Sequence, residues 1–297
     1  MANVKYDADC SENQHFVKLF DDVLKIIRED LSDGDISKAV FEIVLRRRRS
    51  ISNSCAVENF ESLTDLCAYF YRFSPISAGL ARNKTLAAIR DCKELRSCLE
   101  QPSLKILSVG SGPGSDLIGL CSALYESKLL YEKTALEKLK LILVDNNEKW
   151  ETLFQATVQV LCESNFGYTS RFFKSKEVST EFICCDVSKT ADVEYEEAFE
   201  EADIIWVKGL LSFLRSSNAR SCALKTIMTL MKPGTLLMVI DSPECKQFEK
   251  YTVDLKLIFS KKSEGFLFGE EPRIIYGPGI CSFTDQELSV FVKFKFD

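Results

Sequence analysis

Residues 105–120 read Lys-Ile-Leu-Ser-Val-Gly-Ser-Gly-Pro-Gly-Ser-Asp-Leu-Ile-Gly-Leu, and this stretch decides the fold. A short apolar run at 106–109 enters a turn with glycines at 110, 112 and 114, and a helical apolar pattern follows from Leu117. Glycines let the backbone approach a ligand closely, and the helix N-terminus offers that ligand unpaired N–H groups. The order of strand, loop and helix therefore predicts a ligand-binding loop at the end of a buried strand.

The spacing of the glycines separates two kinds of binding loop. A dinucleotide fingerprint, G-x-G-x-x-G, has its third glycine five positions after the first. Here Gly114 follows Gly110 by four positions, and Ser115 stands where the dinucleotide loop has glycine. Further along, residues 139–147 read Leu-Lys-Leu-Ile-Leu-Val-Asp-Asn-Asn, an apolar run that Asp145 closes. A tight G-x-G-x-G loop is thus followed by a strand that ends in a carboxylate.

The loop and the strands after it resemble class I S-adenosylmethionine (SAM)-dependent methyltransferases. In that family an acidic residue at the end of the second strand holds the ribose of the cofactor, which fits Asp145. A later strand, Glu-Phe-Ile-Cys-Cys-Asp-Val, supplies Asp186 near the adenine, with Val187 as an apolar wall. The resemblance covers residues 104–297 and implies SAM as the cofactor.

The resemblance implies a cofactor site built from the glycine loop and the strand ends. Many members of the family carry an acidic residue two positions before the first glycine, and this chain has Ser108 there. Asp116, just after the loop, is expected to do part of that work. The expected cofactor-binding residues are Gly110, Ser111, Gly112, Gly114, Asp116, Asp145, Asn146, Asp186 and Val187.

Lys208 and Tyr71 are the candidate catalytic residues. Lys208 ends the strand Ile-Ile-Trp-Val-Lys, at the edge of the sheet where this fold places the substrate. A desolvated lysine there would act as a base or orient an acidic substrate, and the alternative is a surface lysine at a strand end. Tyr71 belongs with Tyr69, Arg72 and Phe73 to an aromatic–basic cluster suited to stacking a planar substrate, and the alternative is core packing.

Residues 1–103 read as helices without a strand–helix–strand pattern. Apolar stripes at helical spacing begin at Phe16, at Ile36 and at Leu63. The third is expected to end near Ser74-Pro75, since the residue before a proline disfavours helix, and a fourth helix is expected over 76–99. These residues are interpreted as an N-terminal helical cap over the carboxyl ends of the strands, which helps to select the substrate.

Residues 104–297 alternate between strands and helices, which predicts an α/β fold with a doubly wound, mostly parallel sheet. The resemblance makes this the SAM-binding domain and implies seven strands. Residues 288–296 alternate between apolar and polar residues and are expected to form an antiparallel edge strand paired with 255–259.

Composition narrows the possible partners and the location. The net charge of −6 gives no support for non-specific nucleic-acid binding. No signal peptide and no apolar run of membrane-spanning length is present, so we expect an intracellular protein, cytoplasmic or nuclear, with no membrane partner and with reduced cysteines. With one histidine and no C-x-x-C pair, no metal site is expected. The oligomeric state is not predicted.

The resemblance implies methyl transfer from SAM, and three features favour an RNA base as the acceptor, ribosomal RNA included. These are the helical cap, the basic run Arg46–Arg49 and the aromatic–basic cluster. The basic run also suits a helix C-terminus, which favours cations. A small-molecule amine or hydroxyl is the alternative acceptor, in keeping with the acidic net charge. A non-catalytic binding module is the second alternative, against which the complete glycine loop counts.

Overall fold

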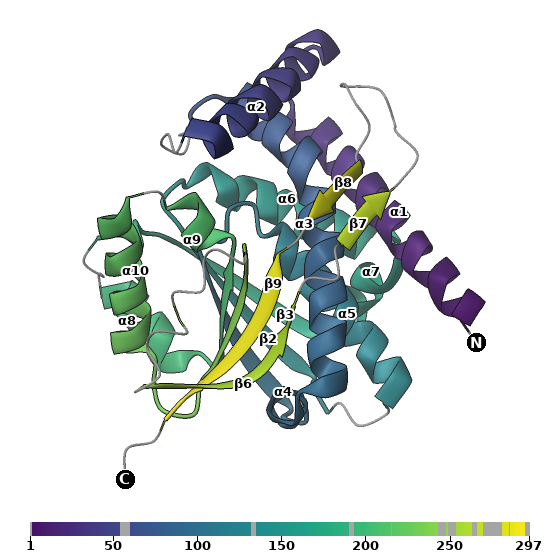
Figure 1. Cartoon of the computed structure of the whole chain (residues 1–297). Helices are drawn as coiled ribbons and strands as arrows, with labels where there is room; N and C mark the ends of the chain where they lie inside the picture. The colour runs from purple at the N-terminus through teal and green to yellow at the C-terminus, as the bar shows by residue number, and fades with distance from the viewer. Residues whose placement is uncertain are drawn as a thin grey trace.

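A seven-stranded sheet lies between two layers of helices in the computed structural model of the chain (Figure 1). The structure describes residues 2–53, 60–131, 135–189, 193–214, 216–242, 248, 254–262, 266–269, 281–284 and 286–294. The strand order is β3-β2-β1-β4-β5-β9-β6. The strands are β1 Ser103–Val109, β2 Lys138–Asp145, β3 Glu177–Cys184, β4 Ile204–Lys208, β5 Leu236–Asp241, β6 Leu255–Lys261 and β9 Glu287–Lys293.

The strand directions confirm the predicted doubly wound sheet. β3, β2, β1, β4 and β5 pair in parallel, and β9 pairs antiparallel with both β5 and β6. The predicted partnership between the C-terminal strand and residues 255–259 is therefore confirmed. β9 ends at Lys293, and the predicted extension to 295 and 296 lies outside the described residues. The carboxyl ends of the five parallel strands lie along the same edge of the sheet, which we call the carboxyl edge.

The two helical layers follow from the alternation of side chains along the strands. On β4, Trp206 is buried toward one layer and Ile205 and Val207 toward the other. The first layer holds α5 (Ser115–Tyr131), α6 (Lys149–Glu163) and α7 (Gly167–Ser175), joined by the N-terminal helices α1 (Ala2–Ile27), α2 (Asp33–Asn53), α3 (Leu63–Asp91) and α4 (Lys93–Leu99). The second holds α8 (Val193–Glu201), α9 (Leu210–Phe213) and α10 (Ser217–Leu230). Within the described chain no helix has the length and apolarity for a membrane crossing.

The helix α3 runs through the expected break at Ser74-Pro75, so the predicted end there and the separate helix over 76–99 are wrong. Pro75 lacks an N–H donor and costs a helix interior about 3 kcal/mol. The apolar face of α3 nevertheless continues beyond it, with Ala78, Leu80 and Ala81 all buried. Packing of this face outweighs the local penalty. The chain leaves the helix only at Cys92, which is extended, before α4.

The closest approach in the first layer is between α3 and α5. A Cβ atom added at Gly119 would lie 2.0 Å from the Ala78 carbonyl oxygen, so the two backbones touch. One turn further along α3, Arg82 forms a buried ion pair with Glu126 at 2.5 Å. The N-terminal helices therefore share one hydrophobic core with the sheet. The body of α3 packs along α5 on one face of the sheet, whereas the segment that leads into α3 reaches the carboxyl edge, where the Phe60 carbonyl accepts from Asn147. The role of residues 1–103 as a cap over that edge stays a prediction.

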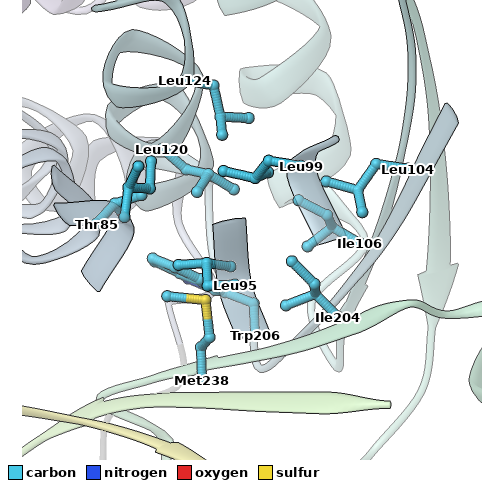
Figure 2. Close-up of a pocket in the computed structure, with 11 residues that line it drawn as sticks. Thr85, Leu95, Leu99, Leu104, Ile106, Leu120, Leu124, Ile204, Trp206 and Met238 are labelled. Carbon is cyan, nitrogen blue, oxygen red and sulfur yellow. The ribbon is translucent and has the colours of Figure 1, made fainter. Parts of the chain in front are cut away.

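A small apolar cavity lies inside the first layer, between α3, α4, α5 and the middle of the sheet (Figure 2). Its volume of about 10 Å³ has room for no more than one water molecule. The hydroxyl of Thr85, which lines it, has no hydrogen-bond partner among the described residues. The other lining residues are Ile89 and, labelled in Figure 2, Leu95, Leu99, Leu104, Ile106, Leu120, Leu124, Ile204, Trp206 and Met238. This is a packing defect rather than a ligand site.

The connection between β6 and β9 carries a second, two-stranded sheet that the sequence did not predict. β7 (Phe266–Gly269) pairs antiparallel with β8 (Cys281–Thr284). The strand register places the end of β6 and the start of β9 at the carboxyl edge, since Lys261 is opposite Leu288 and Leu288 opposite Ile240. This hairpin, the β7–β8 arm, therefore leaves the sheet at the carboxyl edge, and β7 contacts α3 (Figure 1).

Candidate active site

The glycine loop contains two glycines needed for packing and one that faces open space. Gly110, Gly112 and Gly114 have φ angles of +70°, +52° and +66°, a backbone region that favours glycine. A Cβ atom at Gly110 would lie 2.7 Å from Leu210, and one at Gly114 would lie 2.5 Å from Phe154. At Gly112 no atom of the described residues lies within 4 Å of an added Cβ atom. The outer glycines therefore permit close packing, whereas Gly112 leaves a space that a side chain would fill.

Asp145 faces this loop from the last position of β2. One carboxylate oxygen accepts a hydrogen bond from the Gly112 backbone N–H at 2.8 Å, and the other accepts from the Asn147 backbone N–H at 3.2 Å. Burial raises the pKa of Asp145, and these backbone donors act in the opposite direction. The backbone N–H groups of Gly110 and Ser111 bond to the Val144 carbonyl, which fixes the loop against β2. The structure thus brings the glycine loop and Asp145, the two strongest candidates from the sequence, into direct contact.

Asp116 lies just after the glycine loop in sequence, and Lys208 lies close enough to Asp116 to affect its pKa. Asp116 lies in the first turn of α5 and is only 5% exposed, and the indole N–H of Trp206 donates to its carboxylate at 2.5 Å. Burial raises the pKa of Asp116, while the positive charge of Lys208 and the Trp206 donor lower it. Lys208 ends β4 at the carboxyl edge, half-buried. The buried hydroxyl of Ser115 has no hydrogen-bond partner among the described residues.

Asp186 lies two residues beyond the end of β3, rather than at the strand end. Its carboxylate accepts from the Ser188 N–H and hydroxyl at 3.0 and 2.6 Å and pairs with Lys189 at 3.1 Å. Burial raises the pKa of Asp186, but these donors outweigh it and hold the pKa below its ordinary value. Val187 beside it is buried, and Asn146 is exposed next to Asp145. The adenine-binding roles of these residues stay predictions.

The aromatic–basic cluster is divided between two environments. Tyr71 is buried in the core of the helical layer, 3% exposed, which favours the packing alternative left open by the sequence. Tyr69 instead packs against Trp150 at the start of α6, with ring centroids 5.4 Å apart, and against Phe73 at 5.1 Å. The Arg72 guanidinium lies over the Phe73 ring. The catalytic role of Tyr71 stays a prediction.

Asp241 is a site residue that sequence reasoning did not select. It is the last residue of β5, 3% exposed, and burial raises its pKa. Its carboxylate accepts from the backbone N–H groups of Leu211 at 2.9 Å, Ser212 at 3.3 Å and Ser242 at 2.8 Å. Asp241 thereby holds the turn that follows Lys208. The sequence does contain a signal for Asp241, because this residue closes an apolar strand as Asp145 does.

The sheet order, the antiparallel β9 and the glycine loop facing Asp145 define the class I SAM-dependent methyltransferase fold. A family model described as "Putative SAM-dependent methyltransferase" matches residues 11–256, and the chain belongs to this family.

Solved structures similar to the chain share little sequence with it. The N-methyltransferase NodS from Bradyrhizobium japonicum has 14% identity and a TM-score of 0.38, over 71% of this chain and 97% of that one. TrmN from Thermus thermophilus has 14% identity and a TM-score of 0.43, over 76% of this chain and 53% of that one. An rRNA methylase from Streptococcus thermophilus has 11% identity and a TM-score of 0.39, over 73% and 96%. A search of curated proteins finds no match.

Asp145→Ala is expected to weaken SAM binding about 10- to 100-fold, since removing a buried acceptor of ligand hydrogen bonds costs about 1–3 kcal/mol. Isothermal titration calorimetry with SAM measures the change. Glu148→Ala is the matched control, because it removes an exposed carboxylate three residues further along the same loop. Equal affinity for SAM in a folded Asp145→Ala protein would remove Asp145 from the cofactor site.

Proposed function

We propose that the chain transfers the methyl group of SAM to an amine or hydroxyl of a small molecule that is neutral or positively charged. Methyl transfer from SAM is supported by the space that the described residues leave at Gly112, whose backbone N–H donates to Asp145, with Asp116 just after the loop and Lys208 near Asp116. The restriction to neutral or positively charged acceptors rests on the excess of acidic side chains at the carboxyl edge.

The residues around the glycine loop fit SAM. Gly112 leaves room for a ligand where any side chain would intrude. The buried Ser115 hydroxyl forms no hydrogen bond with the described residues and is therefore available to form one with the ligand. Asp145 would accept from the ribose hydroxyls, and Asp116 would offer negative charge to the amino-acid end of the cofactor. SAM supplies an electrophilic methyl group on a sulfonium centre. The protein's contribution is to hold the acceptor in line and to exclude water.

The charges at the carboxyl edge support an acceptor without phosphate groups. The described residues at the ends of the parallel strands and in the loops after them include four carboxylates, Asp145, Glu148, Asp186 and Asp241, against two cations, Lys189 and Lys208, and Asp116 adds a fifth carboxylate at the start of α5. A polyanion would meet net negative potential there, whereas nucleic-acid sites depend on clustered positive charge. Lys208 lies close enough to Asp116 to affect its pKa, and we assign it the role of orienting the acceptor.

An RNA base is the second candidate acceptor, and the features that favoured it have packing roles in the structure. Arg46 pairs with Asp65 on α3 at 2.8 Å, and Arg72 lies over Phe73. Tyr71 is buried. The side chains of Arg47–Arg49 lie outside the described residues. Residues 1–103 remain our proposed substrate-selecting region, because the segment that leads into α3 reaches the carboxyl edge. The β7–β8 arm contacts α3 and is part of the same proposed region.

The test is transfer of tritiated methyl groups from SAM into fractionated extracts. Because the composition predicts an intracellular protein, cytoplasmic and nuclear extracts are separated into RNA, protein and small molecules. We expect label in the small-molecule fraction with the natural chain and none with Gly112→Val. Ribonuclease-sensitive label would overturn the proposed acceptor in favour of RNA. SAM binding without label in any fraction would instead support a non-catalytic binding module.

A further inference from the structure

The loop that follows Asp145 is joined to the N-terminal helices by two side chains. The Asn147 side-chain amide donates to the Phe60 carbonyl oxygen at 2.9 Å, and the Lys149 ammonium donates to the carbonyl oxygen of Glu61. Both acceptors are backbone groups of the residues that lead into α3. The chain separation is 87 and 88 residues, so these contacts are tertiary links rather than local turns.

Asn147 contacts both the carboxylate and the helical layer. Its backbone N–H donates to Asp145 at 3.2 Å, and its side-chain oxygen accepts from the Lys149 backbone N–H at 3.2 Å. Its side-chain amide N–H donates to the Phe60 carbonyl oxygen in the segment that leads into α3. A shift of the Asp145 carboxylate is therefore transmitted through one residue to the segment before α3.

The segment that receives these bonds is itself fixed to α2 and α3. The Phe60 ring packs against Tyr69 at 4.8 Å and against Trp150 at 5.6 Å. Ser62 caps α3 by accepting from the Asp65 N–H, and Asp65 pairs with Arg46 of α2. We call residues 60–65 the α3 junction. Because it adjoins the carboxyl edge, its position helps to define the wall of the acceptor site.

We propose that Asn147 is a positioning residue that couples SAM binding at Asp145 to docking of the α3 junction. This inference rests on the proposed use of SAM. If the cofactor fixes the Asp145 carboxylate, it also fixes Asn147 and hence the Phe60 carbonyl. Coupling between two sites is reciprocal, so loosening the α3 junction weakens SAM binding by the same factor by which SAM strengthens docking.

The test uses the full chain and SAM alone. Asn147→Ser keeps a short hydrogen-bond acceptor for the Lys149 N–H but cannot reach Phe60, and Lys149→Met cuts the second link without touching Asp145. We expect each to lower SAM affinity about 3- to 10-fold, the range for one lost hydrogen bond. Gln155→Met is the matched control, because it removes an exposed bond to Glu151 on the same helix and should leave affinity unchanged.

Hydrogen exchange separates coupling from simple structural support. In the natural chain, SAM should slow amide exchange in peptides covering residues 60–73, and both variants should lose this SAM-dependent protection while keeping native circular dichroism. If the natural chain binds SAM without protection of 60–73, the coupling is wrong and the proposed function stands. If the natural chain does not bind SAM at all, the proposed function fails. Unchanged affinity in both folded variants would also overturn the coupling.

Discussion

Gly112→Val abolishes SAM binding and leaves the fold intact: this is the largest effect we expect on function. No atom of the part of the chain that the structure describes lies within 4 Å of an added Cβ atom, so the side chain causes no clash within the protein. A branched side chain there would fill the space left for the cofactor. We expect SAM affinity to fall more than 100-fold, about 2.7 kcal/mol or more, at or above the upper end of the about 1–3 kcal/mol that one buried polar group left without its partner costs. Calorimetry measures the affinity for SAM, and circular dichroism measures whether the fold is intact.

A control must account for the backbone strain of the substitution. Gly112 has φ +52°, where a non-glycine residue costs about 1–2 kcal/mol. Gly234→Val carries the same kind of strain at φ +88°, in the turn before β5 and away from the glycine loop. It should lose thermal stability while keeping its affinity for SAM. A folded Gly112→Val protein with natural affinity would show that the loop does not cradle the cofactor.

Gly119→Ala should cause the largest loss of stability. The added Cβ atom would lie 2.0 Å from a backbone oxygen of α3, so one helix must move as a whole. Overpacking costs about 1–3 kcal/mol and occasionally more, and a clash with backbone at this distance places Gly119→Ala at the upper end, from which the better helix propensity of alanine returns about 1 kcal/mol. We expect the free energy of unfolding in urea to fall by about 2 kcal/mol or more.

Gly34→Ala is the matched control for helix propensity. Among the described atoms its added Cβ atom would meet the Ser32 hydroxyl alone, at 3.6 Å, so the same substitution on α2 should be neutral or slightly stabilising. Equal unfolding midpoints for the Gly119→Ala and natural chains would mean that α3 and α5 do not touch at this point.

The sheet and the glycine loop could be predicted because buried parallel strands leave a simple pattern. β2 and β4 each contain an apolar run that a charged residue closes at the carboxyl edge, Asp145 in β2 and Lys208 in β4. The same rule would have selected Asp241. The course of α3 could not be predicted, because a penalty visible at Pro75 is outweighed by packing against α5, which leaves no local signal.

The link between Asn147 and Phe60 could not be predicted for a related reason. A side chain that bonds to a distant backbone carbonyl depends on position and not on the residue type of its partner. The division of the aromatic–basic cluster was likewise hidden, because neighbouring helical residues such as Tyr69 and Tyr71 point to different surroundings.

The contact between α3 and α5 also sets the order in which the chain can fold during synthesis. α3 is complete at Asp91, but its partner is complete only at Tyr131. At 5–20 residues per second, the ribosome takes roughly 2–8 s to make the intervening segment. For that time the face of α3 that packs against α5, which includes Ala78 and Arg82, lacks its partner helix, while α1 and α2 are already available to cover other parts of α3. We therefore expect nascent chains arrested before residue 131 to bind chaperones and longer ones to release them, as crosslinking on stalled ribosomes would measure.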